Sequence, residues 1–441
     1  MKLDRRLFLK SASLAAVSLS HPSLAASLNP ISKPQQFDPS VIGLTVPEIN
    51  IVRVAVIGVG DRGTHYINQL LNIDGVSITA ICDTDSTALD KVMEQFSQRD
   101  LKAPDRFTGN EQTYLDLLTK NDIDIVIICT PWEWHAPMAI DAMESGKHVL
   151  VEAPMALSVE ECWQIVNTSE KTQKNCMMME SINYGRDALM VLNMVRKGVL
   201  GELLHAEASY NLKLHKHMQQ LTPKMGNLDR YKNVKLNGSY YPTHGLGPVS
   251  LYMDIHRGDR FDYITAMTSP SSPSSNQDNR EQQHPLKGLD VNINTSLIKT
   301  VKGRTIIINN TVNHGSASSV QTAPHSRIQG TKGSYISSPN RIVLSSNTNE
   351  QYLNTFNWEQ KYQHPLWQQL DRQTKHHCLS HNMDFLMLWR VVYCLRNGEP
   401  LDQNVYDGAA LSVVSILSEI SISNRSHSVN FPDFTRGQWQ T

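Results

Sequence analysis

The sequence predicts an α/β fold: a parallel, doubly wound sheet in the first half of the chain, then an α+β domain with an open, largely antiparallel sheet. Two observations predict the first half. Short apolar runs rich in Val and Ile alternate with stretches of helical periodicity up to about residue 180, and a glycine-rich turn follows the first run. A third observation predicts the second half, because several later segments alternate apolar and polar residues in the manner of strands.

The expected elements of the first half follow one another in strict alternation. Strands are expected over residues 52–57, 76–82, 124–130, 148–152 and 175–180, and helices over residues 61–72, 88–97, 136–145 and 159–173. Pro131 and Pro154 end two of the strand runs, and Gly146 stops one of the helices. This alternation is typical of parallel strands joined by crossover helices. In sheets of this kind, ligands bind at the carboxyl ends of the strands.

The second half mixes strands and helices without such alternation. Strands are expected over residues 202–210, 255–267, 291–298 and 304–312, and helices over residues 187–197, 384–397 and 406–423. Residues 269–285 are dominated by Ser, Pro, Asn and Gln, which predicts a loop. The chain contains no internal repeat.

The first 26 residues are typical of an export signal. Arg5-Arg6 precede Leu7-Phe8-Leu9-Lys10 and a mildly apolar stretch, and small residues at Ser23 and Ala25 indicate cleavage after Ala25 or Ala26. The pattern resembles a twin-arginine signal, which carries folded proteins, so a periplasmic location is expected. An ordinary secretory signal with a chance pair of arginines is the alternative. We therefore expect a signal peptide over 1–26, a Pro-rich linker over 27–50, a nucleotide-binding domain over 51–180 and a substrate-binding domain over 181–441.

Composition narrows the choice of partners. Lys plus Arg number 41 and Asp plus Glu 42, a net charge of −1, which gives no reason to expect nucleic acid or an acidic membrane surface. After residue 26 no apolar run approaches the length of a membrane span. The six Cys contain no CxxC pair and are too few for a disulfide scaffold. A homo-oligomer is compatible with the sequence but is not predicted by it.

A dinucleotide-binding turn is indicated by Gly58-Val59-Gly60-Asp61-Arg62-Gly63, which follows an expected strand and opens an expected helix. Gly58 permits the tight turn, Gly60 lets a pyrophosphate approach the helix N-terminus, and Gly63 allows close packing of helix and strand. Asp83 ends the next strand, 25 residues after Gly58, and its carboxylate suits the hydroxyls of an adenosine ribose. These residues predict a Rossmann-type site that prefers NAD to NADP; a relic of the fold without cofactor is the alternative.

Further cofactor contacts are expected after the later strands of the same sheet. Trp132-Glu133-Trp134-His135 follows one strand and Glu152-Ala153 follows the next. We expect the two tryptophans to pack against the nicotinamide ribose. The alternative is a helix that begins after Pro131 and uses the tryptophans as core residues.

Several longer motifs carry a resemblance. The strand–GxGxxG–helix unit, a TPxxxH segment and an ExP segment resemble the glucose–fructose oxidoreductase and inositol dehydrogenase superfamily. Longer stretches look closest to one branch, the NAD-dependent α-N-acetylgalactosaminidases of glycoside hydrolase family 109. They are WEWHAPMAIDAM (132–143), VLNMVRKG (191–198), YPTHGLGPV (241–249), QGTKG (329–333) and CLRNGEPLDQNVYD (394–407). Sugar dehydrogenases of the superfamily carry a catalytic Lys between the Glu and the Pro, where this chain has Ala153.

The resemblance implies two sets of site residues. The NAD contacts fall on Asp61, Arg62, Asp83, Trp132, Glu133, Trp134, His135, Glu152, Ala153 and Ser181, and the substrate contacts on Tyr210, Arg230, Tyr241, Pro242, Thr243, His244 and His325. Two of these depart from the family pattern: Ser181 stands where the family usually has Asn, and His325 where it has Tyr. Asn211 and the two residues after it also lack an expected acidic and His pair.

The resemblance further implies the reaction: hydrolysis of a terminal α-linked N-acetylgalactosamine from a glycan or small glycoside, with retention. Oxidation at C3 precedes elimination, addition of water and reduction, so NAD is regenerated in each turnover. His244 is the candidate acid/base and Tyr241 its helper, both within a turn set by Pro242 and Gly245. The alternative for His244 is a purely structural role. The alternatives for the protein are a net sugar oxidoreductase and a sugar-binding module that keeps NAD structurally. His377 and His381 have helical spacing without a clear third ligand, so no metal site is predicted.

Overall fold

The structure is a computed structural model. It describes residues 39–212, 238–239, 241–269, 293–312, 325–345, 355–373 and 382–440. The expected signal peptide, the loop from residue 270 onward, Arg230, His377 and His381 lie outside these residues.

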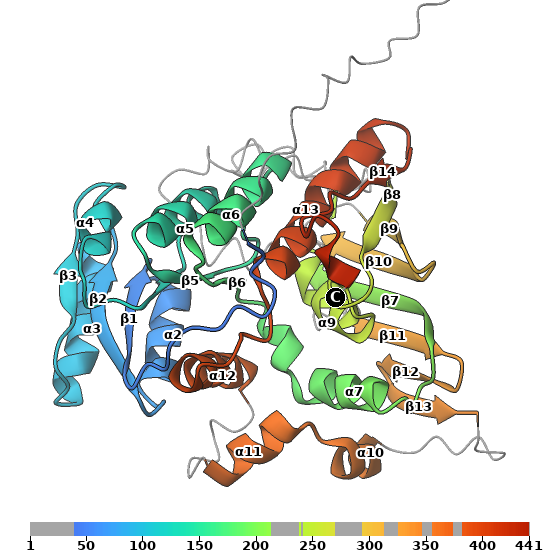
Figure 1. Ribbon diagram of the computed structural model, residues 1–441, viewed down its shortest axis with the longest axis horizontal. Coiled ribbons are helices and arrows are strands. Elements are labelled where there is room, and N and C mark those ends of the chain that lie inside the picture. Colours follow the sequence, from blue (N-terminus) through green and yellow to red (C-terminus); the bar gives the residue numbers. More distant parts are fainter. Residues whose placement is uncertain are drawn as a thin grey trace, which may run out of the picture. The chain divides into compact units, whose positions relative to one another are not determined.

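A six-stranded parallel sheet forms the first half of the chain, as predicted (Figure 1). Its order is β3-β2-β1-β4-β5-β6, so the chain starts in the middle and winds outward in both directions. The strands are β1 (Val52–Ile57), β2 (Val76–Cys82), β3 (Asp105–Phe107), β4 (Ile125–Ile128), β5 (His148–Val151) and β6 (Cys176–Met178). The helices are α2 (Asp61–Leu70), α3 (Ser86–Gln98), α4 (Tyr114–Leu118), α5 (His135–Glu144) and α6 (Val159–Thr172).

The register of this sheet brings its functional loops to one edge. Ile57, the last residue of β1, pairs with Cys82 at the end of β2 and with Ile128 at the end of β4. The strand order reverses between β1 and β4, which is where ligands bind in open sheets of this kind.

An eight-stranded mixed sheet forms the second half, in the order β13-β12-β11-β7-β10-β9-β8-β14. Its strands are antiparallel except for the parallel pair β7 and β10, which confirms the largely antiparallel sheet. The strands are β7 (Leu203–Leu212), β8 (Phe261–Ser269), β9 (Ile293–Thr300), β10 (Thr305–Val312), β11 (His325–Gly330), β12 (Gly333–Ser337), β13 (Asn340–Leu344) and β14 (Val429–Asn430). The helices are α7 (Arg186–Arg196), α9 (Thr243–Tyr252), α10 (Thr355–Tyr362), α11 (Pro365–Gln373), α12 (Met383–Asn397) and α13 (Val405–Ser423).

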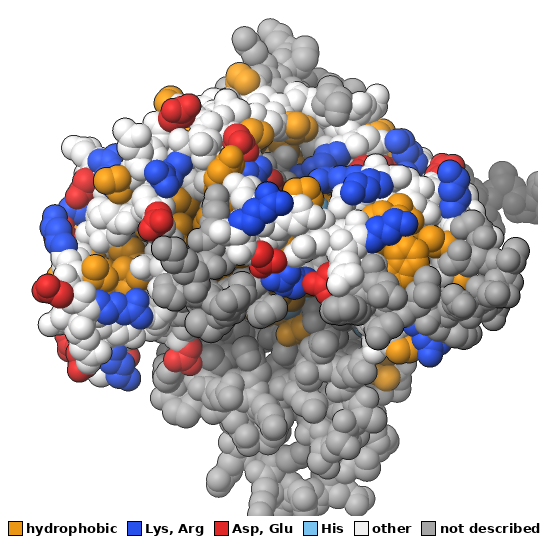
Figure 2. Space-filling model, turned by 90° about the horizontal axis from the view of Figure 1, so that it is seen from below, with side chains coloured by type: hydrophobic (Ala, Val, Ile, Leu, Met, Phe, Trp, Pro, Cys, Tyr) orange, Lys and Arg blue, Asp and Glu red, His pale blue; other side chains and the backbone are white. Residues whose placement is uncertain are grey.

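The last long helix, α13, packs against strands of both sheets. It contacts β6 of the first sheet and β8 of the second. By length and composition α13 is apolar enough to cross a bilayer, but 72% of its most apolar window is buried inside the protein. It is therefore a core helix. On the face shown in Figure 2, basic and acidic side chains are interspersed over the described residues, in keeping with the net charge of −1.

The expectation of a linker over residues 27–50 is wrong for its last part. Val41 is buried, and its backbone N–H donates to the Tyr406 hydroxyl on α13. The same hydroxyl donates to Glu170, which also accepts from Arg436 near the end of the chain. Apolar residues spaced along 41–49 supply the packing that the Pro-rich composition concealed.

Two parts of the expected second half are also corrected. The sequence predicts a turn at the YPTHG segment, but Thr243 is the first residue of helix α9, and Pro242 precedes it. Pro has no backbone N–H to lose at a helix start, so it begins this helix rather than breaking it. The strand expected over 255–267 begins only at Phe261, because Asp254 and His256 adopt positive φ in a turn.

Candidate active site

The glycine-rich turn at the end of β1 has the geometry that a dinucleotide requires. Gly58 has a φ of +84°, and a Cβ there would lie 2.6 Å from the carbonyl oxygen of Cys129. A Cβ on Gly63 would lie 1.9 Å from the Gly58 carbonyl oxygen, so α2 packs tightly against this turn. A Cβ on Gly60 would meet nothing within 4 Å, and Gly60 has no side chain to cap α2. The approach to the helix N-terminus is therefore open to a phosphate.

Asp83 is held in place by backbone donors. Its Oδ2 accepts from the N–H of Val59 at 2.7 Å, and its Oδ1 accepts from the N–H of Asp85 at 2.9 Å. A cavity of about 250 Å³ lies beside it, lined among others by Gly60, Tyr114 and Trp134. An apolar cavity with a fixed carboxylate at its edge suits an adenosine and its ribose, so these residues fit NAD.

The two tryptophans of the short helix η1 (Trp132–Trp134) point to different places. Trp134 lines the cavity beside Asp83 and meets Tyr114 edge-on, with ring centroids 6.5 Å apart. Trp132 packs against Tyr241, with centroids 5.7 Å apart. The structure therefore places one tryptophan with the expected adenosine site and the other with the expected substrate residues.

His135 is buried at the start of α5 and joins two loops of the site. Its Nδ1 lies 2.7 Å from the carbonyl oxygen of Pro154, and its Nε2 lies 2.8 Å from that of Thr130. Neither ring nitrogen is turned toward the cavity. His135 thus holds the loop after β4 against the loop after β5 and supports the cofactor site from behind.

Glu152, at the end of β5, is committed to the residues of α2. Its Oε1 accepts from Arg62 Nε at 2.6 Å and from the Tyr66 hydroxyl at 2.5 Å. Arg62 belongs to the glycine-rich motif, so this contact joins the loop after β5 to the first turn of α2. Asp61 also lies in that first turn, and Glu133 lies between the two tryptophans.

An aromatic and histidine cluster lies next to these loops. The His244 ring meets the Tyr241 ring at 4.6 Å and the Tyr210 ring edge-on at 4.8 Å. The Tyr241 hydroxyl donates to the carbonyl oxygen of Ala153 at 2.8 Å. The predicted catalytic pair, His244 and Tyr241, is therefore brought together with Trp132, Tyr210 and the loop after β5.

The acid that orients His244 was not predicted from the sequence. Glu180, two residues after β6, is fully buried, and its carboxylate oxygens lie 2.8 and 2.9 Å from His244 Nδ1. Burial lowers the pKa of His244, but the charge and hydrogen bond of Glu180 outweigh this effect and raise it. Because Nδ1 faces Glu180, Nε2 is the nitrogen of His244 that can exchange a proton with a substrate. An acidic residue at the carboxyl end of the last parallel strand was the only sequence signal for this pair.

The comparisons with known proteins assign the chain to a family. Residues 184–441 match the model of the glycosyl hydrolase 109 C-terminal domain, and residues 52–180 match the oxidoreductase family with an NAD-binding Rossmann fold. A glycosyl hydrolase family 109 protein of Shewanella pealeana is 52% identical over 100% of this chain and 98% of its own length. A glycosyl hydrolase family 109 protein of Shewanella baltica is 51% identical over 100% of this chain and 97% of its own length. The chain belongs to glycosyl hydrolase family 109.

Solved structures share the fold of this family 109 protein at low identity. A levoglucosan dehydrogenase in complex with NADH and levoglucosan has a TM-score of 0.62 at 15% identity, over 87% of this chain and 100% of its own. An Agrobacterium radiobacter oxidoreductase in complex with NAD⁺, L-tartaric acid and magnesium has a TM-score of 0.58 at 18% identity. The match covers 86% of this chain and 98% of that one. The first part of the family 109 chain is thus an NAD-binding Rossmann domain, as predicted.

Glycines in α9 let the segment that carries His244 in this family 109 chain lie close to its neighbours. A Cβ on Gly245 would lie 3.0 Å from the backbone N of Ser209 on β7. A Cβ on Gly247 would lie 2.8 Å from Cγ of Glu180. The HGLG sequence therefore brings His244 close to both Tyr210 and Glu180, which is a packing role rather than the turn expected for Gly245.

The remaining predicted substrate residues of the family 109 site fall in different places. Pro242 and Thr243 are buried at the start of α9, and the Thr243 hydroxyl has no hydrogen-bond partner among the described residues. His325 pairs with Ser209 across β7 and β11, so it faces away from Tyr210, and its Nδ1 contacts the Ser337 hydroxyl. The structure thus does not bring His325 into the cluster, and Arg230 lies outside the described residues.

Proposed function

We propose that this family 109 hydrolase removes terminal α-linked N-acetylgalactosamine from glycans, with retention, and that it uses its bound NAD catalytically. The YPTHG and WEWH motifs resemble the branch that carries this activity. The geometry adds independent support, since it joins the predicted acid/base to the NAD-binding loops.

The arrangement of carboxylates is the observation that carries the proposal. Hydrolysis by two carboxylates needs one acid and one nucleophile or base on either side of the glycosidic bond. Here Glu180 is fully buried against His244, and Glu152 accepts from Arg62 and Tyr66. Among the described residues, Glu180 and Glu152 therefore serve other side chains, which supports His244 as the group that transfers the proton.

Each residue of the cluster has a role in the proposed reaction. Bound NAD would supply reversible hydride transfer with the sugar, and this chemistry would make the proton on the neighbouring carbon acidic. His244, oriented by Glu180, moves a proton through Nε2. Tyr241 is fixed by its bond to the Ala153 carbonyl, and its ring lies beside that of His244, where it would contact the same sugar. Trp132 and Tyr210 supply aromatic walls for a sugar ring.

A chromogenic assay tests this function against net oxidation. Purified protein is incubated with the p-nitrophenyl α-glycoside of N-acetylgalactosamine, with and without added NAD. The β-anomer and the α-galactoside without the acetamido group are controls. Release of p-nitrophenol from the first substrate without accumulation of NADH supports the proposal. An oxidised sugar formed in step with NADH would instead identify a sugar oxidoreductase, and no reaction with the α-glycoside would refute the substrate.

We also propose that the protein is exported through the twin-arginine route. The motive is the Arg5-Arg6 pair in residues 1–26. In the native host, changing both arginines to lysine should retain the full-length protein in the cytoplasm. An unchanged periplasmic fraction would refute this route.

A further inference from the structure

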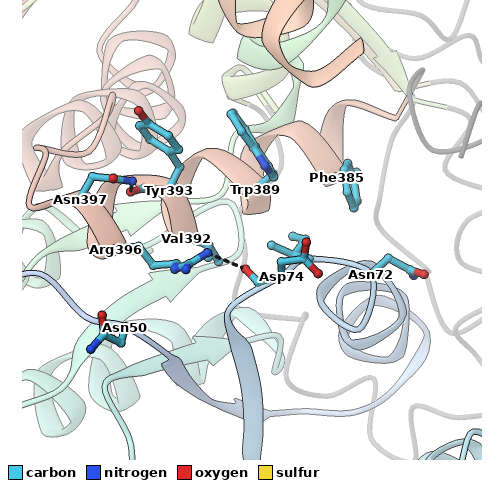
Figure 3. A pocket seen from close by; sticks show the side chains of 10 residues that line it. Asn50, Asn72, Asp74, Phe385, Trp389, Val392, Tyr393, Arg396 and Asn397 are labelled. Carbon is cyan, nitrogen blue, oxygen red and sulfur yellow. Dashed lines mark hydrogen bonds between the residues drawn. The ribbon is translucent and has the colours of Figure 1, made fainter. Parts of the chain in front are cut away.

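Helix α12 comes from near the end of the chain and packs along α2 of the NAD-binding domain (Figure 1). Both ends of α12 are tied to α2 or to the loop after it. Near the start of α12, Asp384 contacts Arg62 and His65; near its end, Arg396 donates to the carbonyl oxygen of Asp74 at 3.2 Å (Figure 3). A cavity of about 540 Å³ lies along this helix between the two ends, where Trp389 is among its lining residues.

Asp384 is a buried carboxylate that accepts from three side chains. Arg62 donates to both of its oxygens, with Nη1 3.0 Å from Oδ2 and Nη2 3.1 Å from Oδ1. His65 Nε2 lies 3.0 Å from Oδ2, and Ser181 also hydrogen-bonds the group. Burial alone would raise the pKa of Asp384, but the bond from His65 and the charge of Arg62 hold it well below its usual range. These donors therefore favour the charged form of the Asp384 carboxylate.

Arg62 is shared between Asp384 and Glu152. Its Nε donates to Glu152, so three of its five donor hydrogens are committed to two protein carboxylates. Two anions more than offset the charge of one guanidinium. The pair of carboxylates therefore fixes the orientation of Arg62 and adds no net attraction for an anionic ligand.

The location of Arg62 gives this fixation a function. Arg62 is the second residue of α2, two residues after the open position at Gly60, and 43% of its side chain is exposed. A guanidinium held rigidly at a helix N-terminus loses little freedom when a dinucleotide binds there, and preorganisation of this kind slows dissociation. Ser181, the third predicted cofactor residue tied to this network, bonds directly to Asp384.

We propose that Asp384 is a positioning residue of the NAD site, which holds Arg62 and Ser181 in the arrangement that retains the bound nucleotide. The proposal rests on NAD binding and is independent of which glycoside is hydrolysed. It also assigns a cofactor role to a residue outside the Rossmann sequence.

The test measures NAD release from the purified protein in the absence of any glycoside. Protein loaded with radiolabelled NAD⁺ is chased with unlabelled NAD⁺, and retained label is followed over time. Asp384→Asn keeps the shape of the side chain and removes its charge, and it should release NAD at least tenfold faster than the wild type. Asp384→Glu keeps the carboxylate and should restore most of the slow release. Equal release from wild type and Asp384→Asn, or equally fast release from the Asn and Glu variants, would overturn the proposal.

A matched control separates positioning from general docking of the helix. Arg396→Ala removes the contact at the other end of α12 and should leave NAD release within about twofold of wild type. If it accelerates release as much as Asp384→Asn, the role of Asp384 is only to dock α12, and the proposal fails.

A variant of Arg62, the residue that Asp384 contacts, tests the proposal if Asp384→Asn does not fold. Arg62→Gln changes the more exposed side of the contact and should accelerate release to the same extent. Where Asp384→Asn folds, adding it to Arg62→Gln should accelerate release by much less than it does alone, because Asp384 acts largely through Arg62. Wild-type retention in Arg62→Gln, or full additivity of the two changes, would overturn the proposal.

Discussion

Replacing Glu180 by Gln tests whether the buried acid makes His244 an effective proton carrier. The substitution keeps the volume of the side chain and one hydrogen-bond acceptor, but it removes the charge that faces His244 Nδ1 at 2.8 Å. A hydrogen bond between charged groups contributes about 1.5–3 kcal/mol. If that energy is used when His244 becomes protonated during the reaction, its loss lowers kcat by about 10–150-fold at 1.4 kcal/mol per factor of ten.

The pH dependence gives this prediction its second readout. Because Glu180 raises the pKa of His244, the limb of the kcat profile that reports His244 should move to lower pH in Glu180→Gln. Stability follows the same linkage. A His whose pKa is raised in the folded protein stabilises the fold fully at any pH below its unfolded pKa of about 6.5. This stabilisation is lost as the pH rises through the pKa of the folded state. The Tm deficit of the variant should therefore be largest at acidic pH and shrink as pH increases.

The assay combines initial rates on the chromogenic α-glycoside from acidic to alkaline pH with thermal denaturation over the same range. NAD content is measured for each preparation, since Glu180 does not contact the nucleotide-binding turn and the variant should keep its cofactor. A folded, NAD-loaded Glu180→Gln with wild-type kcat and an unmoved profile would refute the proposed role of the Glu180–His244 pair.

Three further outcomes are expected. His244→Ala should keep NAD and lower kcat by about 10²–10⁴-fold, with a smaller loss for Tyr241→Phe; normal turnover in the His244 variant would place the proton transfer elsewhere. Asp83→Ala should weaken NAD binding by about 1.5–3 kcal/mol, measured by calorimetric titration of the nucleotide-free protein, and unchanged affinity would contradict the assigned ribose contact. Hydrolysis in deuterated water should give a product of retained configuration with deuterium at C2, detected by NMR, whereas an unlabelled, inverted product would indicate direct displacement.

The parallel sheet was predictable because its strands are buried on both faces and read as continuous apolar runs. The dependence on continuous apolar runs also explains why one strand could not be predicted. β3 (Asp105–Phe107) is short, polar and at the edge of the sheet, so its sequence carries no such run. The sequence around α9 predicts a turn because Pro and two glycines fall among its first six residues. In the structure the glycines allow the close approach of α9 to Ser209 on β7 and to Glu180.

The site was predictable where its residues are adjacent in sequence. The glycine-rich turn and Asp83 follow from one strand–turn–helix unit. By contrast, Glu180 and His244 are 64 residues apart, and their contact depends on how α9 packs against the end of the first sheet. The position of His325 depends on the register of β11 against β7, and a shift of one residue would turn it to the other face.

The packing of α12 on α2 makes the complete nucleotide-binding half depend on residues near the end of the chain. Domains usually fold in sequence as the ribosome releases them, the N-terminal one first. Here the nucleotide-binding half lacks part of its cover until residues 383–397 have emerged, close to the end of the 441-residue chain. The N-terminal segment at residues 39–50 waits for the same region, because Ile49 bonds to Leu395 and Val41 to Tyr406. A chain truncated before α12 would therefore lack the Asp384–Arg62 and Ile49–Leu395 contacts that join this half to the end of the chain.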